Sequence, residues 1–477
     1  EAYVMNGWLA LMRGTELTEE KAERARSLEE ILSDICERAA ENGVLDKESI
    51  TERDLFDTAL MGVLTARPSE VIDRFYRLYE TSPEAATDDF YRMQCAVNYI
   101  RTERVAKDLK WQVETPYGTM DMTINLSKPE KDPKAIAAAK HQKAAGYPKC
   151  LLCHECEGFA GDLSRPARQN LRQIPMQMAG KKWFLQYSPY VYYNEHCIAL
   201  SAEHEPMRID RQSFVKALDF VTEFPHYFIG QNADLPIVGG SILSHDHMQG
   251  GCYTFPMERA EIILPVKFAK YPSVTAGIVN WPMSVLRLRS ADKAALVDLA
   301  DEIRIAWSGY SDEANGVVAF TDDVPHNAIT PIARRRGEDF ELDLVLRNNL
   351  TSEEFPMGIY HPHADKHNIK KENIGLIEVM GLAILPARLK KEMARLGEII
   401  LAGGDVRADA DCEKHADWLD SFKSSYTFTA ENIESILYEE IGKTFTAVLE
   451  DAGVYKATDE GRQAMMKFVE YAGGVSC

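Results

Sequence analysis

The chain has 477 residues, of which 45% are hydrophobic and 27% are charged, a composition that excludes a disordered chain and predicts a globular protein with a large core. Its net charge of −20 argues against nucleic acid as the main partner, because a phosphate polymer is repelled everywhere except at a local basic pocket. A small anionic ligand is compatible with this charge.

Neither a membrane anchor nor a secreted protein is expected. No apolar run approaches the roughly 20 residues that a bilayer span requires, and the opening EAYVMNGWLALMRG lacks the basic stretch and cleavage pattern of a signal peptide. The 9 cysteines extend from Cys36 to Cys477 with one close cluster, which favours reduced thiols and a metal over a disulfide framework. We therefore expect a cytoplasmic protein.

The first 110 residues are predicted to be helical. In LTEEKAERARSLEEILSDICERAAENG, apolar residues recur at helical spacing and Gly43 supplies a stop signal. A strand is predicted next, and its alternating apolar residues are Met120, Met122, Ile124 and Leu126. The segment 127–148 that follows is predicted to form a turn and a short helix.

Three further regions are expected downstream. Residues 111–265 should mix strands and helices, with an amphipathic helix in RIDRQSFVKALDFVTEFP and a buried hairpin framed by LPIVGG and GGCYTFP. Residues 266–385 contain a second strand-rich block, in which VVAFTDDVPHNAITPIARRRGEDFELDLVLRNN ends in an alternating strand. From Gly381 onward the chain is predicted to turn helical again, so that 386–477 forms a helical segment, and LPARLKKEMARLGEIILAGG is a helix ended by a glycine pair.

A pair of cysteines indicates a metal site. Cys150 and Cys153 have the C-x-x-C spacing that lets two thiolates reach one tetrahedral ion from a single turn. A redox pair is the alternative, although no thioredoxin-type strand and helix surround this motif. Cys156 and His154 are nearby alternative ligands, and for Cys156 we favour a structural role.

A structural zinc site needs two more ligands, and histidines in strand-rich segments are the usual donors. His204, which lies just beyond an apolar strand, and His245 qualify. Composition alone favours an ordinary hydrogen-bonded role for each of them over a role as a ligand.

Four stretches carry a resemblance to a known family: CLLC, SAEHEPM, GGSILSHDHMQGG and YHPHADKHNIKKENIGLIEVMGLAILPARL. Over about residues 100–400 the chain resembles the galactose-1-phosphate uridylyltransferases of the longer bacterial type, which carry UMP between UDP-glucose and galactose 1-phosphate in the Leloir pathway. The resemblance implies an α+β fold of two histidine-triad-like half-domains with antiparallel sheets and added helices at both ends. It implies UDP-glucose, UDP-galactose and hexose 1-phosphates as ligands, and it is compatible with a homodimer.

The shorter type of this family has an H-P-H-x-Q motif, whose first histidine closes a zinc site and whose second is the nucleophile. Carried over by position, the resemblance implies His247 as the nucleophile and a structural zinc. The implied zinc ligands are Cys150, Cys153, His204 and His245. The chain departs from the motif at Asp246, which stands in place of proline, so the details of this loop differ.

The spacing of the motif suits this chemistry. In a strand, His245, His247 and Gln249 share one face, so a metal ligand, a nucleophile and a phosphate donor line up. A neutral imidazole attacks phosphorus well near pH 7, and its other nitrogen needs an acceptor, for which a backbone carbonyl near His245 is our candidate. Histidine-triad hydrolases carry a histidine where this chain has Gln249, whereas a glutamine suits an intermediate that waits for a sugar phosphate.

Other residues are candidates for substrate contacts. The resemblance implies that Asn194, Glu195 and Asn232 contact uridine and ribose. Gly239 and Gly240 permit close backbone approach, and Ser241 can donate to a phosphate, with a plain tight turn as the alternative.

Basic residues also gather in places. Arg165, Arg168 and Arg172 form either a sugar-phosphate clamp or a solvated basic face. The run 334–336 suggests a clamp with less support.

The second half reads as a divergent copy of the first. YHPHAD, like SHDHMQ, places histidines at alternate positions, which suggests two related halves. Asp365 replaces the glutamine, and a carboxylate would repel a phosphate, so His361 and His363 are not expected to form a second transfer site. In the shorter type these histidines help to bind a second metal, iron, but a further histidine of that site is replaced here near LVLRNN. We favour a structural or substrate-lining pair.

Two rival functions remain. One is a dinucleotide polyphosphate phosphorylase or hydrolase of the same superfamily. The other is a non-catalytic, zinc-stabilised nucleotide-binding module, which explains the four predicted ligands but gives no reason for His247 and Gln249.

Overall fold

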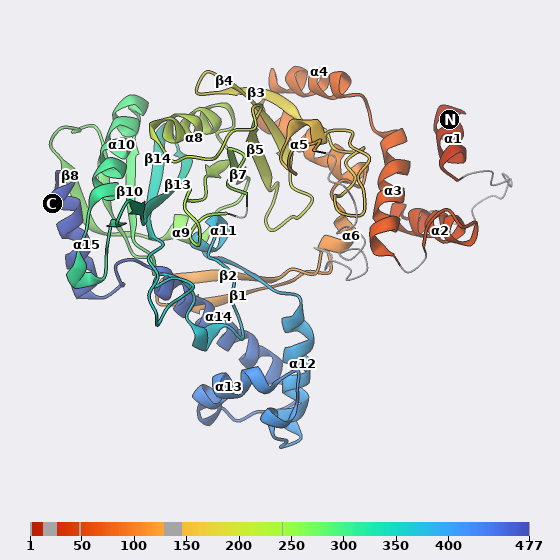
Figure 1. Cartoon of the computed structure of the whole chain (residues 1–477). Helices are drawn as coiled ribbons and strands as arrows, with labels where there is room; N and C mark the ends of the chain where they lie inside the picture. The colour runs from red at the N-terminus through yellow and green to blue at the C-terminus, as the bar shows by residue number, and fades with distance from the viewer. Residues whose placement is uncertain (1, 13–25, 47–48, 128–145, 241, 477) are drawn as a thin grey trace. The chain divides into compact units, whose positions relative to one another are not determined.

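The fold is known from a computed structural model that describes residues 2–12, 26–46, 49–127, 146–240 and 242–476 (Figure 1). The chain divides into two compact units. Unit 1 comprises Glu1–Lys107, Ser127–Val191 and Glu195–Glu205, and unit 2 comprises Asp108–Leu126, Tyr192–Asn194 and Pro206–Cys477. The four-part division expected above stays a prediction. The short helix expected within 127–148 falls almost wholly outside the described residues.

Unit 1 consists of helices that are followed in the sequence by a small antiparallel sheet. Its helices are α1 (Ala2–Leu11), α2 (Leu28–Glu41), α3 (Ile50–Leu64), α4 (Pro68–Tyr79), α5 (Pro83–Ala96) and α6 (Thr102–Val105). Its strands are β3 (Ile174–Met178), β4 (Lys181–Tyr187) and β5 (Cys197–Ser201), with β4 in the middle. The predicted helix that ends near Gly43 is confirmed from Leu28.

Aromatic packing joins the helices of unit 1 to its sheet. The ring of Phe90 on α5 lies 5.9 Å from that of Phe75 on α4 and 5.2 Å from that of Tyr187 on β4. The Tyr187 hydroxyl donates to the backbone carbonyl of Thr87 at 2.9 Å, so its polar end is satisfied inside this core.

Unit 2 contains most of the strands. They are β1 (Leu109–Thr115), β2 (Gly118–Ile124), β6 (Phe228–Gly230), β7 (His247–Gly251), β8 (Ile262–Phe268), β9 (Thr275–Val279), β10 (Val285–Ser290), β11 (Phe320–Thr321), β12 (Val324–Pro325), β13 (Asn327–Arg336), β14 (Asp339–Asn348), β15 (Leu382–Leu385) and β16 (Gly474–Ser476). Eight of them form an antiparallel sheet in the order β16-β8-β9-β10-β14-β13-β6-β7. A second sheet has the order β1-β2-β15.

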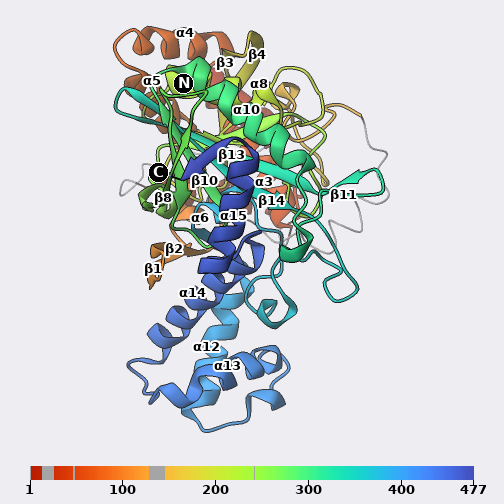
Figure 2. The same cartoon turned by 90° about the vertical axis from the view of Figure 1, so that its left-hand side faces the viewer.

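The helices of unit 2 lie between and after these strands. They are α8 (Arg211–Glu223), α9 (Pro256–Arg259), α10 (Lys293–Gly309), α11 (Leu376–Val379), α12 (Arg388–Leu401), α13 (Ala416–Phe422), α14 (Ile433–Ala452) and α15 (Asp459–Tyr471). Helix α8 is the predicted amphipathic helix, capped by Asp210 and Ser213 at its start. Figures 1 and 2 show α12, α13 and α14 grouped beneath β1 and β2, away from the larger sheet of this unit. Of the helices in the described residues, none is long and apolar enough to cross a membrane.

The structure corrects two sequence predictions. The hairpin framed by LPIVGG and GGCYTFP is wrong, because β7 pairs with β6, where Gly230 lies opposite Gln249. The prediction that the chain turns helical from Gly381 onward holds for α12 to α15 but misses two strands, since β15 runs parallel to β2 and β16 pairs with β8. The mixed α+β class with antiparallel sheets is confirmed.

The predicted strand with alternating apolar residues is confirmed as β2. Met120, Met122 and Ile124 are buried, as expected. Asp121 between them is buried as well, and its carboxylate accepts hydrogen bonds from Gln112 at 2.8 Å and Tyr253 at 2.7 Å. Asp121 is therefore satisfied inside unit 2 and does not face water.

Candidate metal centre and active site

Three of the four predicted zinc ligands lie together in unit 1. The Cys150 and Cys153 sulfurs are 3.6 Å apart, and the Cys153 sulfur is 3.2 Å from Nδ1 of His204. Zn–S bonds of about 2.3 Å and Zn–N bonds of about 2.0 Å put the ligand atoms of a tetrahedral ion about 3.5 to 3.8 Å apart. This Cys/His cluster could therefore hold a metal ion.

The surrounding backbone suits thiolate ligands. The N–H of Leu152 points at the Cys150 sulfur at 3.4 Å, and the N–H of Cys150 points at the Cys153 sulfur at 3.3 Å. Without an ion, burial raises the pKa of Cys153 to about 11. The His204 nitrogen close to the Cys153 sulfur favours a metal site over a redox dithiol.

The two alternative ligands lie outside the cluster. The Cys156 thiol donates to the backbone carbonyl of Cys150 at 3.3 Å, which is the structural role favoured above. The His154 ring is half-buried and lies 5.1 Å from the ring of Phe184. Among the described residues, the ligand group of unit 1 contains neither of them.

His247 opens β7 in unit 2 and is held by the chain that precedes it. Its Nδ1 lies 2.8 Å from the backbone carbonyl oxygen of His245, the acceptor expected from the sequence. A carbonyl oxygen can only accept, so Nδ1 carries the proton and the lone pair resides on Nε2. Within the described residues, Nε2 has no hydrogen-bond partner.

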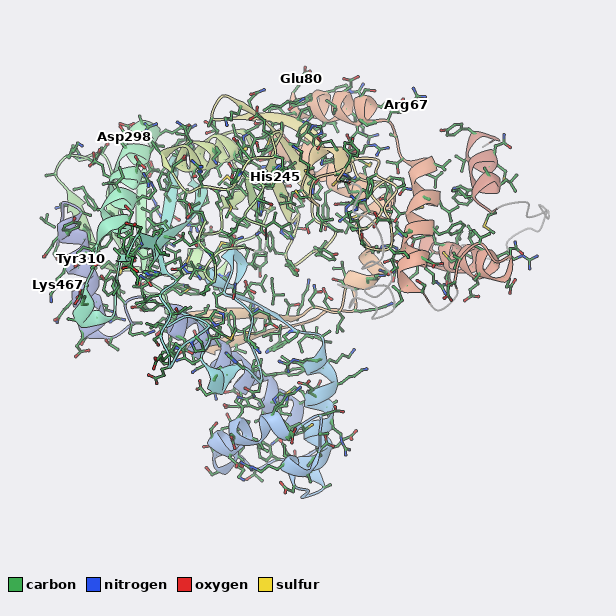
Figure 3. The ribbon with its side chains drawn as sticks, viewed as in Figure 1. Arg67, Glu80, His245, Asp298, Tyr310 and Lys467 are labelled. Carbon is green, nitrogen blue, oxygen red and sulfur yellow. The ribbon has the colours of Figure 1, made fainter. Side chains whose placement is uncertain are left out.

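Burial controls the charge of His247. Only 8% of its surface is exposed, and this burial lowers the pKa of the imidazole below its ordinary value, an effect that the bond to the His245 carbonyl and the Asp246 charge partly oppose. The ring is therefore neutral near pH 7. His245, labelled in Figure 3, is buried with 1% exposure in the segment that leads into β7.

Asp246, between the two histidines, has a role that the sequence analysis missed. Its carboxylate is buried and accepts from the Lys216 ammonium at 2.7 Å and from the Gln231 amide at 2.7 Å. A buried aspartate requires such partners, and Lys216 occupies a buried position of the otherwise apolar face of α8. That lysine is the one sequence signal for a buried charged partner, but it does not identify Asp246 as that partner.

The predicted glycine pair lies against its own loop. A side chain at Gly239 would clash with the backbone carbonyls of Ala233 and Leu235, and a Cβ at Gly240 would lie 2.9 Å from the Asn232 amide nitrogen. The Asn232 carbonyl oxygen accepts from the Leu376 N–H at 2.9 Å, at the start of α11. Within the described loop, both glycines are therefore required for close packing. Ser241 lies outside the described residues.

The predicted uridine and ribose contacts differ in their surroundings. Asn194 is exposed and belongs to unit 2. Glu195 is buried in unit 1 and has a left-handed backbone conformation with φ 54°, which residues other than glycine seldom adopt. Gln249, the predicted phosphate donor, lies half-buried in β7.

The arginines of unit 1 fall into two groups. Arg165 forms an ion pair with Asp162 at 2.6 Å, and the guanidinium of Arg168 lies over the Tyr99 ring at 5.4 Å. Both line a small pocket that Cys150 also lines. Arg172 is buried and donates to the carbonyls of Ala66 at 2.6 Å and of neighbouring residues, so its assignment to a clamp or a solvated face is wrong.

The arginine run 334–336 is engaged within the protein. Arg334 is buried and pairs with Glu341 and Asp343, at 2.6 and 2.8 Å. Arg335 stacks on the Phe340 ring, and Arg336 pairs with Glu258 at 3.0 Å. The suggestion that this run clamps a phosphate is therefore wrong.

The second histidine pair differs from the first. His361 uses both ring nitrogens, with Asn373 at 3.0 Å and the carbonyl of Pro362 at 3.2 Å. His363 also uses both, with the carbonyl of Ile359 at 3.0 Å and the Asp451 carboxylate at 3.4 Å. Neither ring offers a free nitrogen like Nε2 of His247.

Comparisons with known proteins agree with the motifs. The model of the family "galactose-1-phosphate uridyl transferase, N-terminal domain" matches residues 11–206, and that of the C-terminal domain matches residues 220–418. A solved structure of yeast Ap4A phosphorylase Apa2 is similar with a TM-score of 0.33 and 12% identity, over 63% of this chain and 90% of that one. A likeness this distant has no bearing on activity.

Relatives with much higher identity carry one name. Proteins called galactose-1-phosphate uridylyltransferase from Fusobacterium nucleatum and Bacillus subtilis are 54% and 52% identical to this chain, and each alignment covers 94% of it and 89% or 88% of the relative. The protein of that name from Halalkalibacterium halodurans is 55% identical over 92% of this chain and 87% of its own length. With both domain models matched and such relatives along nearly its whole length, the chain belongs to the galactose-1-phosphate uridylyltransferase family.

Proposed function

We propose that this protein transfers UMP from UDP-glucose to galactose 1-phosphate, giving glucose 1-phosphate and UDP-galactose, through a covalent intermediate on His247. The observation that carries the proposal is the hydrogen bond from Nδ1 of His247 to the His245 carbonyl. This bond fixes the tautomer whose Nε2 lone pair is free to attack phosphorus. Membership of the family and the names of the relatives support the choice of substrates.

The reaction proceeds in two displacements. Nε2 of His247 attacks the α-phosphorus of UDP-glucose, an N–P bond forms, and the P–O bond to the β-phosphate breaks as glucose 1-phosphate leaves. A phosphate oxygen of galactose 1-phosphate then attacks the same phosphorus and displaces the imidazole. The Nδ1 bond to the carbonyl stabilises the positive charge that the ring bears in the intermediate.

Gln249 is proposed as the residue that favours transfer over hydrolysis. It lies in the same strand as His247 and two residues further along, so both side chains leave the same face of β7. Its amide donates to a phosphoryl oxygen and offers no titratable proton to a water molecule. At the corresponding place of the second histidine pair, Asp365 carries a negative charge that Lys366 pairs at 2.8 Å.

Zinc is the proposed metal, with His245 as the fourth ligand beside Cys150, Cys153 and His204. Two thiolates and two imidazoles are a common ligand set of structural zinc, and such a closed set leaves no position for substrate. When bound, the ion fixes its ligands rigidly. The chain's own contribution is to hold the His245 backbone, whose carbonyl receives the Nδ1 proton of His247.

The remaining substrate contacts are proposed with adjusted roles. Asn194 and Glu195 are assigned to uridine and ribose. Asn232, Gly239 and Gly240 shape the loop that approaches the phosphates, and Asn232 also holds the start of α11. Arg168 is the stronger candidate for the sugar phosphate, since Arg165 is already paired with Asp162. Ser241 stays a proposed phosphate donor.

The second pair of histidines is proposed to be structural. Both rings are engaged through their nitrogens, which leaves these nitrogens already bonded within the protein and disfavours a second metal such as iron. A homodimer and a cytoplasmic location also remain predictions, and sedimentation of the purified protein would decide the first.

Product analysis tests the proposed function against its rivals. The protein is incubated with UDP-glucose and labelled galactose 1-phosphate, and separately with UDP-glucose and either water or orthophosphate. Label that enters UDP-galactose only in the first mixture supports the transferase. Nucleotide release in the second mixture, without label exchange, would support the phosphorylase or hydrolase. Binding without any turnover would support the nucleotide-binding module.

A further inference from the structure

The buried carboxylate between the two histidines belongs to a three-residue network. Asp246 accepts from Lys216, which lies on α8, and from Gln231, which directly follows β6. The Lys216 and Asp246 side chains are 8% and 9% exposed, and Gln231 is fully buried. Three separate segments of unit 2 therefore converge on one residue of the motif.

The network anchors the residue that directly precedes β7. Helix α8, which carries Lys216, packs on β6 and β13, and β6 pairs with β7. The network therefore ties the start of β7 to a helix and to a neighbouring strand of unit 2.

The peptide group between His245 and Asp246 connects this network to the imidazole. The carbonyl that accepts the Nδ1 proton belongs to that peptide, which is planar and rotates as one piece. Asp246 is the residue on its other side. Fixing Asp246 through two hydrogen bonds therefore fixes the direction of the carbonyl, and with it the direction in which Nε2 points.

We propose that Lys216, Gln231 and Asp246 are positioning residues for the transfer, because they hold the His245–Asp246 peptide that orients His247. This inference rests on the proposed function. The ammonium of Lys216 is needed in this network, because burying the Asp246 carboxylate without a cation costs free energy and would leave the carboxylate free to move. Loss of any one of the three lets the carbonyl turn. A displacement of about 1 Å at the attacking atom slows such reactions on the order of 100-fold.

The test is the rate constant for adduct formation with UDP-glucose alone, measured by rapid mixing, quenching and intact-mass analysis. The amplitude reports the fraction of folded, competent protein, whereas the rate constant reports the orientation of His247 within that fraction. We expect Asp246→Ala and Lys216→Met to lower the rate constant by about 100-fold. Zinc content and the concentration of UDP-glucose at half-saturation should stay near those of the parent protein.

Conservative and control variants make the test specific. Lys216→Arg keeps the cation and should recover most of the rate. Asp246→Asn keeps the shape and should fold even if Asp246→Ala does not, with a slowing of about 10-fold. Lys293→Met is the matched control. It removes the 2.5 Å ion pair between Lys293, on α10, and Asp219, which lies on α8 like Lys216, and it does not touch the motif. Its rate constant should be unchanged.

The failures can be told apart. A parent protein that forms no adduct overturns the proposed function and this inference with it. If the parent forms the adduct and the Asp246 and Lys216 variants lose amplitude but keep the parent rate constant, the network is merely structural and the inference is wrong. Equal slowing in Lys293→Met would overturn it as well.

Discussion

Gly240→Ala is a sharp test of the loop that precedes the motif. The new Cβ would lie 2.9 Å from the amide nitrogen of Asn232 and 3.3 Å from its Cγ, closer than ordinary van der Waals contact. Asn232 is 6% exposed and its carbonyl oxygen is bonded to the Leu376 N–H at 2.9 Å. A shift of about 0.5 Å stretches that bond beyond the usual range.

The cost follows from the stretched bond. A buried N–H left without its partner costs about 1 to 3 kcal/mol, which corresponds to about a 5- to 150-fold faster opening of this local structure. Hydrogen exchange followed by mass spectrometry should therefore show faster exchange in the peptide that contains α11. Gly309→Ala is the control, since no atom lies within 4 Å of its added Cβ, and α11 should exchange there as in the parent. Unchanged protection of α11 in Gly240→Ala would show that the added methyl group does not disturb the Asn232–Leu376 bond.

Three further predictions concern the metal, the nucleophile and the larger sheet of unit 2. Elemental analysis should find that Cys150→Ser has lost zinc, whereas Cys156→Ser should retain it, because the Cys156 thiol donates to a backbone carbonyl. Equal zinc contents in the two variants would contradict the ligand assignment. Because burial lowers the pKa of His247, its neutral form persists on acidification, so the rate constant for adduct formation should fall only below pH 6.5. A midpoint above that value would contradict the lowered pKa. Asp343→Asn should lower the free energy of unfolding in urea by roughly 3 to 5 kcal/mol, since it leaves two buried arginines without their shared carboxylate. The control Asp298→Asn, at the exposed aspartate labelled in Figure 3, should lower it by about 1 kcal/mol or less. Similar losses in both variants would be evidence against this ion network.

Sequence patterns sufficed where the structure is local. Helical periodicity predicted α8 and α12, because that pattern reflects burial within one element, and the alternating strand expected at the end of VVAFTDDVPHNAITPIARRRGEDFELDLVLRNN is β14. The C-x-x-C spacing predicted the meeting of Cys150 and Cys153, which is also local. The carbonyl that holds His247 lies only two residues away and could be predicted from the same stretch.

The errors concern contacts between distant segments. The three residues of β6 are too short to show a pattern, so the apolar LPIVGG was taken as the partner of β7. Arg172 resembles the half-buried Arg165 and Arg168 in sequence, but its guanidinium binds the carbonyls of Ala66 and Thr65, more than 100 residues earlier. Lys216 and Asp246 are 30 residues apart, and only the fold reveals that they form a pair.

The most direct test of the central claim is to locate the UMP group. The protein is mixed with UDP-glucose in the absence of an acceptor, quenched and digested, and the peptides are sequenced by mass spectrometry. The account predicts UMP on the peptide that contains His247, its disappearance on addition of galactose 1-phosphate, and no adduct in His247→Gln. A UMP group on another residue, or label exchange into UDP-galactose with no adduct at all, would contradict it.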